Sequence, residues 1–507
     1  MHNKKILLSL LTSFALSSAV SGDIIKFYNG AVVEGYVVHQ NSKRLTINVN
    51  GKVSTYSKED IQNIDLEQRE VSPPPAPTQT VAESSRKAST YDLLLPDRGG
   101  FTVADSEIGA LNIGLWTYAR YSNQTNIDDT YIDESGQEQE ITQHRRNDVY
   151  INKVSLQFKG WLFNEKFKYL SFIWTSNSHY TEGGNIALIG SMTYDVTNKL
   201  TIGTGIQGLP TTRAMELVHP RLNRVDMRSM AGDYFRGSYA YGFWVEGEAY
   251  EDVYFRTMLG NNMNAVGVNF DQLDNTMDTF STGLWWMNES NDNERTYGGA
   301  YGDFEGHESA AYRVGIHYTH STETRQGQAD EDAIENSQIR LSGGTPIFQS
   351  NIFHSSTGDA LNDAKNLQEL RYQMVAMDAG IKYKGFALEG ELYFRYLDKF
   401  KMLVDTNIGF DSLFDTGFSL QPSYMLIPKK LQFYSEISQI YSDRYTNPWS
   451  AVLGFNWYPT DKAGYAQQFR VNADVQYSEQ SAVGSASQPY ILHGHGFNYT
   501  ANVEYWF

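Results

Sequence analysis

Most of this chain consists of runs of roughly 10–14 residues in which polar and apolar side chains alternate, a period typical of β-strands. In FALEGELYFRYL, which starts at Phe386, apolar side chains alternate with Glu389, Glu391 and Arg395. The connections between the runs are short and long in turn, and we count about sixteen runs between residue 111 and the C-terminus. This pattern predicts an all-β fold, a transmembrane antiparallel β-barrel of about 16 strands with one face toward lipid. The connection at 289–308 is long where a short turn is due, so an additional hairpin there remains open.

Both ends of the chain favour a membrane barrel over a soluble β-sandwich, whose strands also alternate. Residues 1–22 have the pattern of a signal peptide, with Lys4 and Lys5 before a short apolar segment and small residues. The last residues, FNYTANVEYWF, alternate and place Tyr505 and Phe507 on one face. This stretch resembles the C-terminal strand of bacterial outer-membrane barrels. We therefore expect Tyr505 and Phe507 to form the signal that the barrel assembly machinery binds, and outer-membrane lipid to surround the barrel.

The composition excludes disulfide bonds, and the mature chain has no segment suited to a membrane-spanning helix. It has no cysteine, so disulfides play no part, and its formal net charge is −18. After residue 22 no run approaches the roughly 18 apolar residues that a membrane helix needs. Alternating strands are consistent with that absence, because their apolar and polar positions average out along the sequence.

Three regions follow the signal peptide. Residues 23–66 contain short β-rich runs separated by the hairpin dipeptides Asn29-Gly30 and Asn50-Gly51, and they are similar to a small SH3-like or Sm-like β domain. Residues 67–104 are rich in proline and serine and predict a flexible linker, and residues 105–507 form the predicted barrel. We expect residues 23–98 to lie in the periplasm, where 23–66 would bind peptidoglycan or another envelope component. No nucleic acid partner is expected there.

A G-x-G-x-x-G motif at Gly203, Gly205 and Gly208 could indicate a dinucleotide-binding turn. Such a turn needs a helix after it and parallel strands beside it. Here the glycines alternate with Ile202 and Ile206, Pro210 follows, and the flanking segments are predicted hairpins. The motif therefore predicts a membrane strand, and we expect no cofactor.

The segment that follows this strand, 211–237, is the third long connection and is rich in arginine. Guanidinium groups are permanent charges suited to binding phosphate or carboxylate. The sequence therefore predicts a pore constriction that contacts anions. An ordinary solvated loop, or arginines paired with wall carboxylates such as Glu389 or Glu391, is the alternative interpretation. The candidate constriction residues are Arg213, Arg221, Arg224, Arg228 and Arg236. The candidate lumen-facing wall residues are Lys153, Lys159, Lys382, Glu389, Glu391 and Arg395.

The sequence contains no recognisable enzyme motif. There is no cysteine nucleophile, no G-x-S-x-G and no H-E-x-x-H, so we expect no enzyme and no catalytic residues. His493 and His495 lie two residues apart, but a metal site needs a further ligand, and we expect no metal. A serine and a histidine on neighbouring strands would nevertheless escape a search of this kind.

Three stretches together resemble the phosphate-selective porin O/P family of outer-membrane channels. They are RRNDVYINKVSLQFKGWLF at 145–163, KLTIGTGIQGLPTTRAMEL at 199–217, and the hairpin around Asn456, Trp457 and Tyr458 within 450–478. The likeness spreads over about residues 110–507. It implies a trimeric sixteen-stranded porin with passive diffusion through a water-filled pore and basic residues at the constriction formed by the third loop.

Phosphate selectivity does not follow from this resemblance. The loop QTNIDDTYIDESGQEQEITQH at 124–144 carries six acidic residues and no lysine or arginine, and acidic vestibules recruit cations. The expectation is an outer-membrane porin for small polar solutes or ions, with anions such as phosphate among the candidate solutes. The alternative is a structural or adhesive barrel tethered to the envelope by its N-terminal domain.

Overall fold

The computed structural model describes residues 23–40, 44–49, 52–65, 100–134, 136–141, 146–176, 185–217, 221–263, 273, 276–288, 299–325, 339–353, 366–404, 407–460, 466–483 and 494–507. The chain forms two compact units, Met1–Ser85 and Arg86–Phe507, and each is described by itself. The predicted signal peptide and most of the predicted linker lie outside the described residues.

The described part of the first unit is a five-stranded sheet in the order β4-β3-β2-β1-β5. Its apolar core is small and centres on Ile25, Leu45 and Ile47, which are fully buried. A single-turn helix, η1 (Lys58–Asp60), precedes the last strand. The strands are β1 (Asp23–Phe27), β2 (Val32–Gln40), β3 (Arg44–Val49), β4 (Lys52–Ser57) and β5 (Ile61–Asp65). An SH3-like or Sm-like assignment and a periplasmic role for this unit stay predictions.

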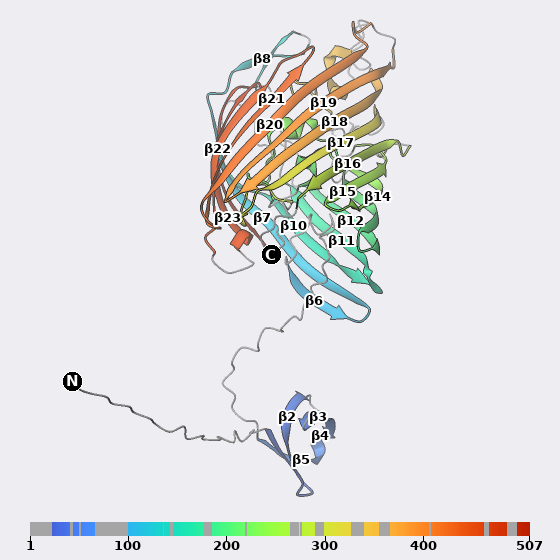
Figure 1. Cartoon of the computed structure of the whole chain (residues 1–507), viewed down its shortest axis with the longest axis vertical. Coiled ribbons are helices and arrows are strands. Elements are labelled where there is room, and N and C mark those ends of the chain that lie inside the picture. Colours follow the sequence, from blue (N-terminus) through green and yellow to red (C-terminus); the bar gives the residue numbers. More distant parts are fainter. Residues whose placement is uncertain are drawn as a thin grey trace, which may run out of the picture. The chain divides into compact units, whose positions relative to one another are not determined.

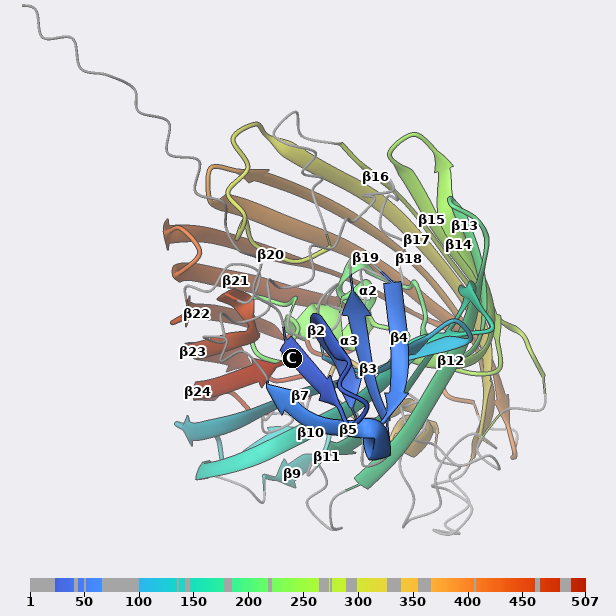
Figure 2. The ribbon, with the colours of Figure 1, turned by 90° about the horizontal axis from the view of Figure 1, so that it is seen from below.

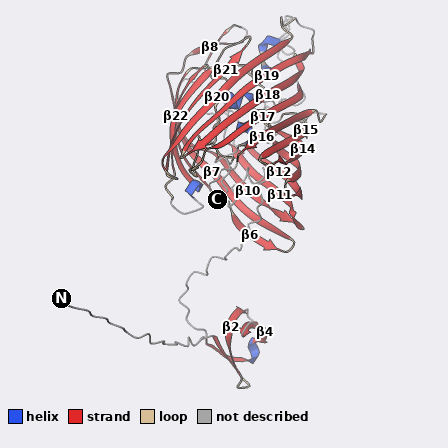
Figure 3. Ribbon diagram, viewed as in Figure 1, coloured by secondary structure: helices blue, strands red, loops and turns tan. Residues whose placement is uncertain are grey.

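The second unit is a closed antiparallel barrel (Figures 1 and 3). Among the described residues, β7 and the fifteen strands β10 to β24 pair in sequence order, and β24 pairs with β7 to close the ring, which confirms the predicted sixteen strands. The strands are β7 (Gly109–Thr125), β10 (Arg146–Leu162), β11 (Asn164–Ser176), β12 (Asn185–Thr197), β13 (Leu200–Gly208), β14 (Tyr239–Tyr250), β15 (Val253–Gly260), β16 (Thr279–Met287), β17 (Ala311–Thr324), β18 (Leu367–Tyr383), β19 (Phe386–Met402), β20 (Ser412–Ile427), β21 (Leu431–Ser442), β22 (Trp449–Trp457), β23 (Phe469–Glu479) and β24 (Gly496–Trp506).

The two faces of the barrel wall differ in chemistry, as the alternation predicts. On β19, Leu392, Phe394 and Tyr396 are exposed on the outside. Glu391 and Arg395 are buried on the inside, in the barrel interior that we call the lumen. Exposed apolar side chains recur on the outward positions of most strands, which is the belt that a lipid bilayer requires. Among the described residues, no helix has both the length and the apolarity to cross a membrane.

The barrel sheet begins earlier than the sequence predicts. Strand β6 (Phe101–Ser106) forms a hairpin with the start of β7, so the predicted boundary between residues 104 and 105 falls inside a strand. The main chain of Phe507 pairs with Leu115 on β7, and Phe101 pairs with Ile113 two residues further along the same edge. The rings of Phe101 and Phe507 lie 4.9 Å apart. The stretch around 101 escaped prediction because all six residues of β6 are exposed and lack a buried apolar face.

The connections alternate between the two ends of the barrel. Tight turns join β10 to β11, β12 to β13 and β18 to β19, and the opposite end carries the long connections except 288–310, which lies at the short-turn end. Two short strands, β8 (Thr130–Ile132) and β9 (Glu138–Glu140), form a hairpin within the first of these. The connection 288–310 joins β16 directly to β17, and its described part, 299–310, contains no strand. The count of sixteen therefore needs no additional hairpin there.

The glycine motif lies on a membrane strand, as predicted. Strand β13 pairs antiparallel with β12 and β14, which excludes the parallel arrangement of a dinucleotide fold. Gly203 faces the lumen, where a Cβ atom would lie 2.1 Å from the indole ring of Trp244. Gly205 has a φ of +118°, a conformation that glycine adopts without strain.

Candidate functional site

The third long connection, 209–238, folds into the lumen, where its helices lie within the ring of strands (Figure 2). We call it the lumen loop. It contains two short helices, α2 (Arg213–Glu216) and α3 (Met230–Phe235). Each starts at a capping hydroxyl: Thr212 accepts from the amide of Met215, and Ser229 accepts from the amide of Gly232. Most of the described side chains of this loop are buried, which distinguishes it from a solvated surface loop.

Helix α3 is attached to one side of the lumen through an apolar cluster. Phe235 stacks on Tyr393 of β19 with 4.9 Å between ring centroids, and Met230 and Tyr234 belong to the same cluster. A second long connection supplies further members, including Ile347 of the single-turn helix η4 (Ile347–Gln349) and Phe353 of η5 (Asn351–Phe353). This side of the lumen, against β18 to β21, is therefore packed with apolar side chains.

Polar contacts also hold helix α3 in its position against the wall. The hydroxyl of Tyr234 contacts Asp415 of β20 and Arg395 of β19, and Arg395 Nη2 lies 2.7 Å from Asp415 Oδ2. Burial raises the pKa of the Tyr234 hydroxyl well above its usual value, so this group stays neutral and acts as a hydrogen-bonding partner.

Helix α2 carries the first candidate arginine, and it is anchored to the wall. Arg213 Nε lies 3.3 Å from Glu389 Oε2, and both side chains are buried. The amide of Ala214 donates to Glu391 at 3.2 Å. Glu216, at the end of the helix, pairs at 2.9 Å with Arg313 of β17. This is the alternative that the sequence left open, in which wall carboxylates pair with loop arginines.

Arg224 is anchored at a different part of the wall. Its Nη2 lies 2.9 Å from Asp474 Oδ1 on β23, and its Nη1 donates to Gln476 at 2.6 Å. The neighbouring Asp226 has a φ of +54° and pairs at 2.6 Å with Lys153 of β10. The lumen loop thus connects wall strands that lie far apart around the ring.

The other three candidate arginines are less enclosed. Arg221 and Arg228 are half-buried, and Arg228 donates to the carbonyl oxygens of Ala214 and Leu217. Arg236 pairs with Asp233 at 2.7 Å and keeps 14% of its side-chain surface exposed. Burial, and after it the charge of Arg236, lowers the pKa of Arg228. The five arginines therefore divide into two buried anchors and three partly accessible groups, and contact of any of them with an anion stays a prediction.

The candidate wall residues all occupy inward positions of their strands. Lys153, Lys382, Glu389, Glu391 and Arg395 are buried, and Lys159 is half-buried. All of the buried ones are engaged: Lys382 donates at 2.6 Å to the carbonyl of Ala300, and Glu391 accepts at 2.8 Å from the hydroxyl of Tyr301. Sequence periodicity predicts which face a residue occupies, but it carries no information about which lumen groups neutralise one another.

Residues 299–307 also enter the lumen, and in the sequence only the unusual length of this connection set them apart. Tyr301 lies under Arg213, with the guanidinium 5.2 Å from its ring centroid, and its amide donates to the carbonyl of Arg221. Asp303 holds the segment at the short-turn end, since its carboxylate accepts from the amides of His307 and Gly385. The segment therefore packs against α2 through the contact between Tyr301 and Arg213.

A ladder of amide side chains was also missed. Asn456 donates to Gln432, Asn472 to Asn456, and Asn502 to Asn472, each at 2.8–2.9 Å, and Arg120 donates to Asn502 at 2.7 Å. The ladder crosses strands β21 to β24 and β7 at one level of the lumen. Single-strand alternation marks each residue as inward, but only the register aligns them.

The first long connection, which is rich in acidic residues, contacts the connection between β17 and β18. Both lie at the barrel end opposite the tight turns. Asp133 accepts at 3.0 Å from Asn351, and Glu134 accepts at 3.0 Å from Thr345. His495 contacts Asp128, whereas His493 lies outside the described residues. Within the described ranges, no group of three or more His, Asp or Glu side chains could hold a metal ion.

One stretch of the wall is rich in lysine. From Lys153 to Trp174, the inward positions of β10 and β11 carry Lys153, Lys159, Lys166 and Lys168 and no carboxylate. Lys168 is matched by Asp195 of β12 at 3.2 Å. The adjoining inward residues of β11 are half-buried, unlike the fully buried wall beneath α3. We call the inward face of β10 and β11 the lysine wall.

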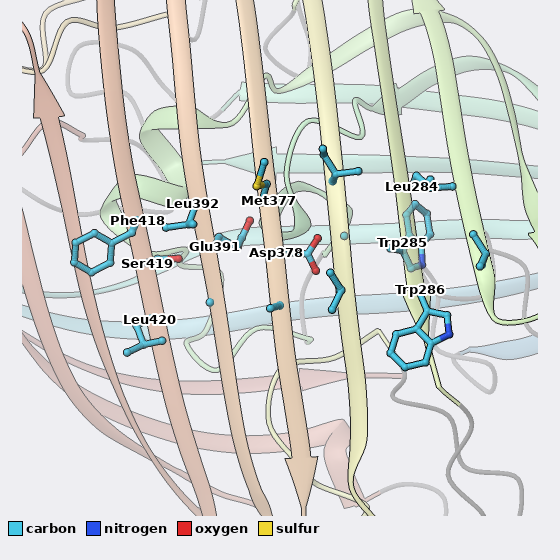
Figure 4. A pocket seen from close by; sticks show the side chains of 16 residues that line it. Leu284, Trp285, Trp286, Met377, Asp378, Glu391, Leu392, Phe418, Ser419 and Leu420 are labelled. Carbon is cyan, nitrogen blue, oxygen red and sulfur yellow. The ribbon is translucent and has the colours of Figure 1, made fainter.

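A groove of 840 Å³ lies on the outward side of β16 to β20 (Figure 4). The paired residues Ala379 and Gly390 form its floor, and Trp286 and Leu420 stand on either side in the same row of neighbours. Since its outward lining is apolar, the groove forms part of the lipid-facing belt.

An apolar outer belt around a charged interior, closed by sixteen antiparallel strands, defines the chain as a transmembrane β-barrel of the outer-membrane type. It is similar in structure to OmpT of Vibrio cholerae, with a TM-score of 0.48 and 10% identity over 80% of this chain and 99% of that one. An anion-selective porin from Comamonas acidovorans matches with a TM-score of 0.47 and 7% identity, covering 79% of this chain and 100% of the porin. The channel DcaP of Acinetobacter baumannii matches with a TM-score of 0.46 and 10% identity, covering 81% and 100%.

No protein-family model matches the chain, and no curated protein matches it in sequence. Membership of the phosphate-selective porin O/P family therefore stays a prediction.

Proposed function

We propose that the protein is an outer-membrane porin through which small polar solutes diffuse passively. The observation that carries this proposal is that helix α3 of the lumen loop packs against one part of the barrel wall. This helix contacts β19, β20 and β21, while Lys159, Trp161 and the inward residues of β11 keep part of their surface exposed. The solute path runs between the lysine wall and the face of the loop that carries Arg228 and Arg236.

The charges along this path favour anions. Arg213 and Arg224 are neutralised by Glu389 and Asp474, so they hold the loop in place. Lys153, Lys168 and Arg236 are also paired, with Asp226, Asp195 and Asp233. We assign the positive field of the path to Lys159 and Lys166, which would lower the barrier for an anion without trapping it. Phosphate is one such anion, and nothing in the geometry singles it out.

Reversal potentials in planar bilayers across a KCl gradient test this proposal. We expect a preference for chloride that falls in the double variant Lys159→Gln/Lys166→Gln. The matched control is Lys401→Gln, a lysine on β19 that is 70% exposed and pairs with Glu369. A preference for potassium in the unmodified protein would contradict the assigned path and point to the acidic first connection as the selective element.

A structural or adhesive barrel is the second candidate, and the apolar cluster inside the lumen favours it. The cluster joins the lumen loop to η4, η5 and the inner faces of β14, β15 and β18 to β21. If folded protein conducts no ions, this packing closes the lumen and the second candidate holds.

Assembly and location complete the proposal. The barrel would form a homotrimer, with residues 23–98 in the periplasm and 23–66 bound to peptidoglycan or another envelope component. Cross-linking in intact membranes tests the trimer. Co-sedimentation of residues 23–66 with peptidoglycan, compared with the full chain, tests the tether.

A further inference from the structure

The lysine wall also carries a strip of apolar side chains that faces the lumen. Phe172 of β11 pairs with Gln157 of β10, and Trp174 pairs with Ser155, so both rings point inward. The orientation is fixed by Lys153, whose Nζ lies 4.7 Å from the centre of the Trp174 ring and 2.6 Å from Asp226 of the lumen loop. We call the inward residues Trp161, Leu170, Phe172 and Trp174 the aromatic strip.

The strip extends along much of the lumen. Trp161 pairs with Lys168, so the strip covers the stretch of β11 from residue 168 to 174, about 20 Å at the rise of a β-strand. Its members are half-buried, in contrast to Tyr393 and Leu397 beneath α3, which are fully buried. Part of their apolar surface therefore faces the water-filled side of the lumen.

The inward face of β11 differs from the usual chemistry of a barrel strand. Inward positions of membrane barrels are normally polar. On β11 the inward positions are Leu170, Phe172 and Trp174, while Ser171 and Thr175 lie on the outward face. Exposing apolar surface to water costs free energy in proportion to the area exposed. An apolar solute that covers this surface removes that cost and is therefore bound.

Cationic groups lie beside the strip. Lys159 pairs with Leu170 in the register, and Lys168 precedes it by two residues on the same face. At the other end, Lys153 lies within electrostatic range of Arg236 of the lumen loop. A solute on the strip would thus place an anionic group next to an ammonium or guanidinium group.

We propose that the aromatic strip is a binding track for organic anions that carry an apolar ring, with aromatic carboxylates as the class that fits. The ring lies on Phe172 and its neighbours, and the carboxylate accepts hydrogen bonds from Lys159 or Lys168. This inference rests on the proposed porin function and names its solute class. Several weak contacts in series allow such a solute to bind and still leave.

The test compares three probes that separate ring from charge. Benzoate has both, acetate has only the carboxylate, and benzyl alcohol has only the ring. Each is added to the full-length protein in a planar bilayer carrying a KCl current. We expect benzoate to reduce the current with an apparent Kd about tenfold lower than that of either other probe, because both contacts act together.

Variants on two faces of one strand provide the control. Phe172→Ala should raise the apparent Kd for benzoate about fivefold, the loss expected for one aromatic contact. Ile173→Ala, on the outward face of β11, should leave it unchanged. Lys159→Gln should weaken block by benzoate while leaving the effect of benzyl alcohol as it was, and it serves if Phe172→Ala does not fold.

Binding is measured in parallel by saturation-transfer NMR on folded, detergent-solubilised protein, which requires no conductance. A KCl current that benzoate leaves unchanged, without NMR transfer, would overturn the track and leave the porin intact. Benzoate binding that Phe172→Ala weakens, in protein that does not conduct, would support the strip and refute the porin. Equal block by benzoate and acetate would show that the ring contributes nothing and would also overturn the proposal.

Discussion

Arg224 in the lumen loop and Asp474 on β23 form a buried ion pair, with 2.9 Å between Nη2 and Oδ1, although 250 residues separate them in sequence. Arg224 was a candidate anion contact by sequence, but here it meets a carboxylate supplied by the wall. A charged group this enclosed has to be paired, because the low polarity around it makes an isolated charge costly.

We expect Arg224→Ala to release this part of the lumen loop. The substitution leaves Asp474 buried without its partner, and breaking a buried pair from one side costs about 3–5 kcal/mol. Single-channel recording should show a larger and noisier conductance than the unmodified protein. Removing both partners in Arg224→Ala/Asp474→Ala should restore part of the stability, since the two changes are coupled. Unchanged conductance and stability in the single variant would show that the pair does not hold the loop.

Replacing Gly203 with a larger residue should lower the stability of the barrel. A Cβ atom there would lie 2.1 Å from Cε2 of Trp244, so the indole ring would have to move. Overpacking of this kind destabilises a fold by about 1–3 kcal/mol, which the midpoint of urea unfolding measures for Gly203→Ala. The matched control is Gly190→Ala on the neighbouring strand, where the nearest atom to a new Cβ is 3.8 Å away. Equal midpoints for the two variants would contradict the close approach.

The anchor at Asp303 should depend on pH. Burial raises the pKa of this carboxyl, but the hydrogen bonds from His307 and from the amides of Gly385 and His307 outweigh burial and lower it. Because the folded pKa lies below the unfolded value of about 3.9, the ionised carboxylate stabilises the fold above that value. The stabilisation is lost as the pH falls through the folded pKa.

The measurement compares the free energy of unfolding of the unmodified protein and Asp303→Asn across pH. The difference should be fully present at neutral pH and should shrink below about pH 4. A difference that stays constant from neutral to strongly acidic pH would show that the ionised carboxylate is not the stabilising form.

The C-terminal residue should matter for assembly. Phe507 pairs with Leu115 through its main chain, and its ring lies against Phe101 of β6. We expect Phe507→Ser to lower the fraction of heat-modifiable, folded barrel in membranes, because the aromatic residue of the proposed assembly signal is lost. Phe101→Ser removes the same ring contact while keeping the terminal residue. If both variants lower assembly equally, the contact within the barrel matters and the proposed assembly signal does not.

Sequence reasoning succeeded wherever one strand contains the whole signal. The inward position of Glu389, Glu391 and Arg395 follows from alternation alone, because the side-chain period of a strand is two. It failed where partners come from different strands: the ladder from Gln432 to Asn502 depends on register, which no single strand specifies. The helices of the lumen loop are four and six residues long, too short for a helical period to be visible.

The sequence by itself determined that this chain forms an alternating antiparallel barrel of about sixteen strands with an apolar outside and a charged inside. These properties are local, since they follow from period, turn chemistry and connection length. Only the tertiary structure decided that Arg213 and Arg224 are anchors, that residues 299–307 pack against α2, and that the apolar residues of β11 face the lumen. The physical reason is that charge neutralisation and packing depend on distances across the ring, which are set by closure of the barrel.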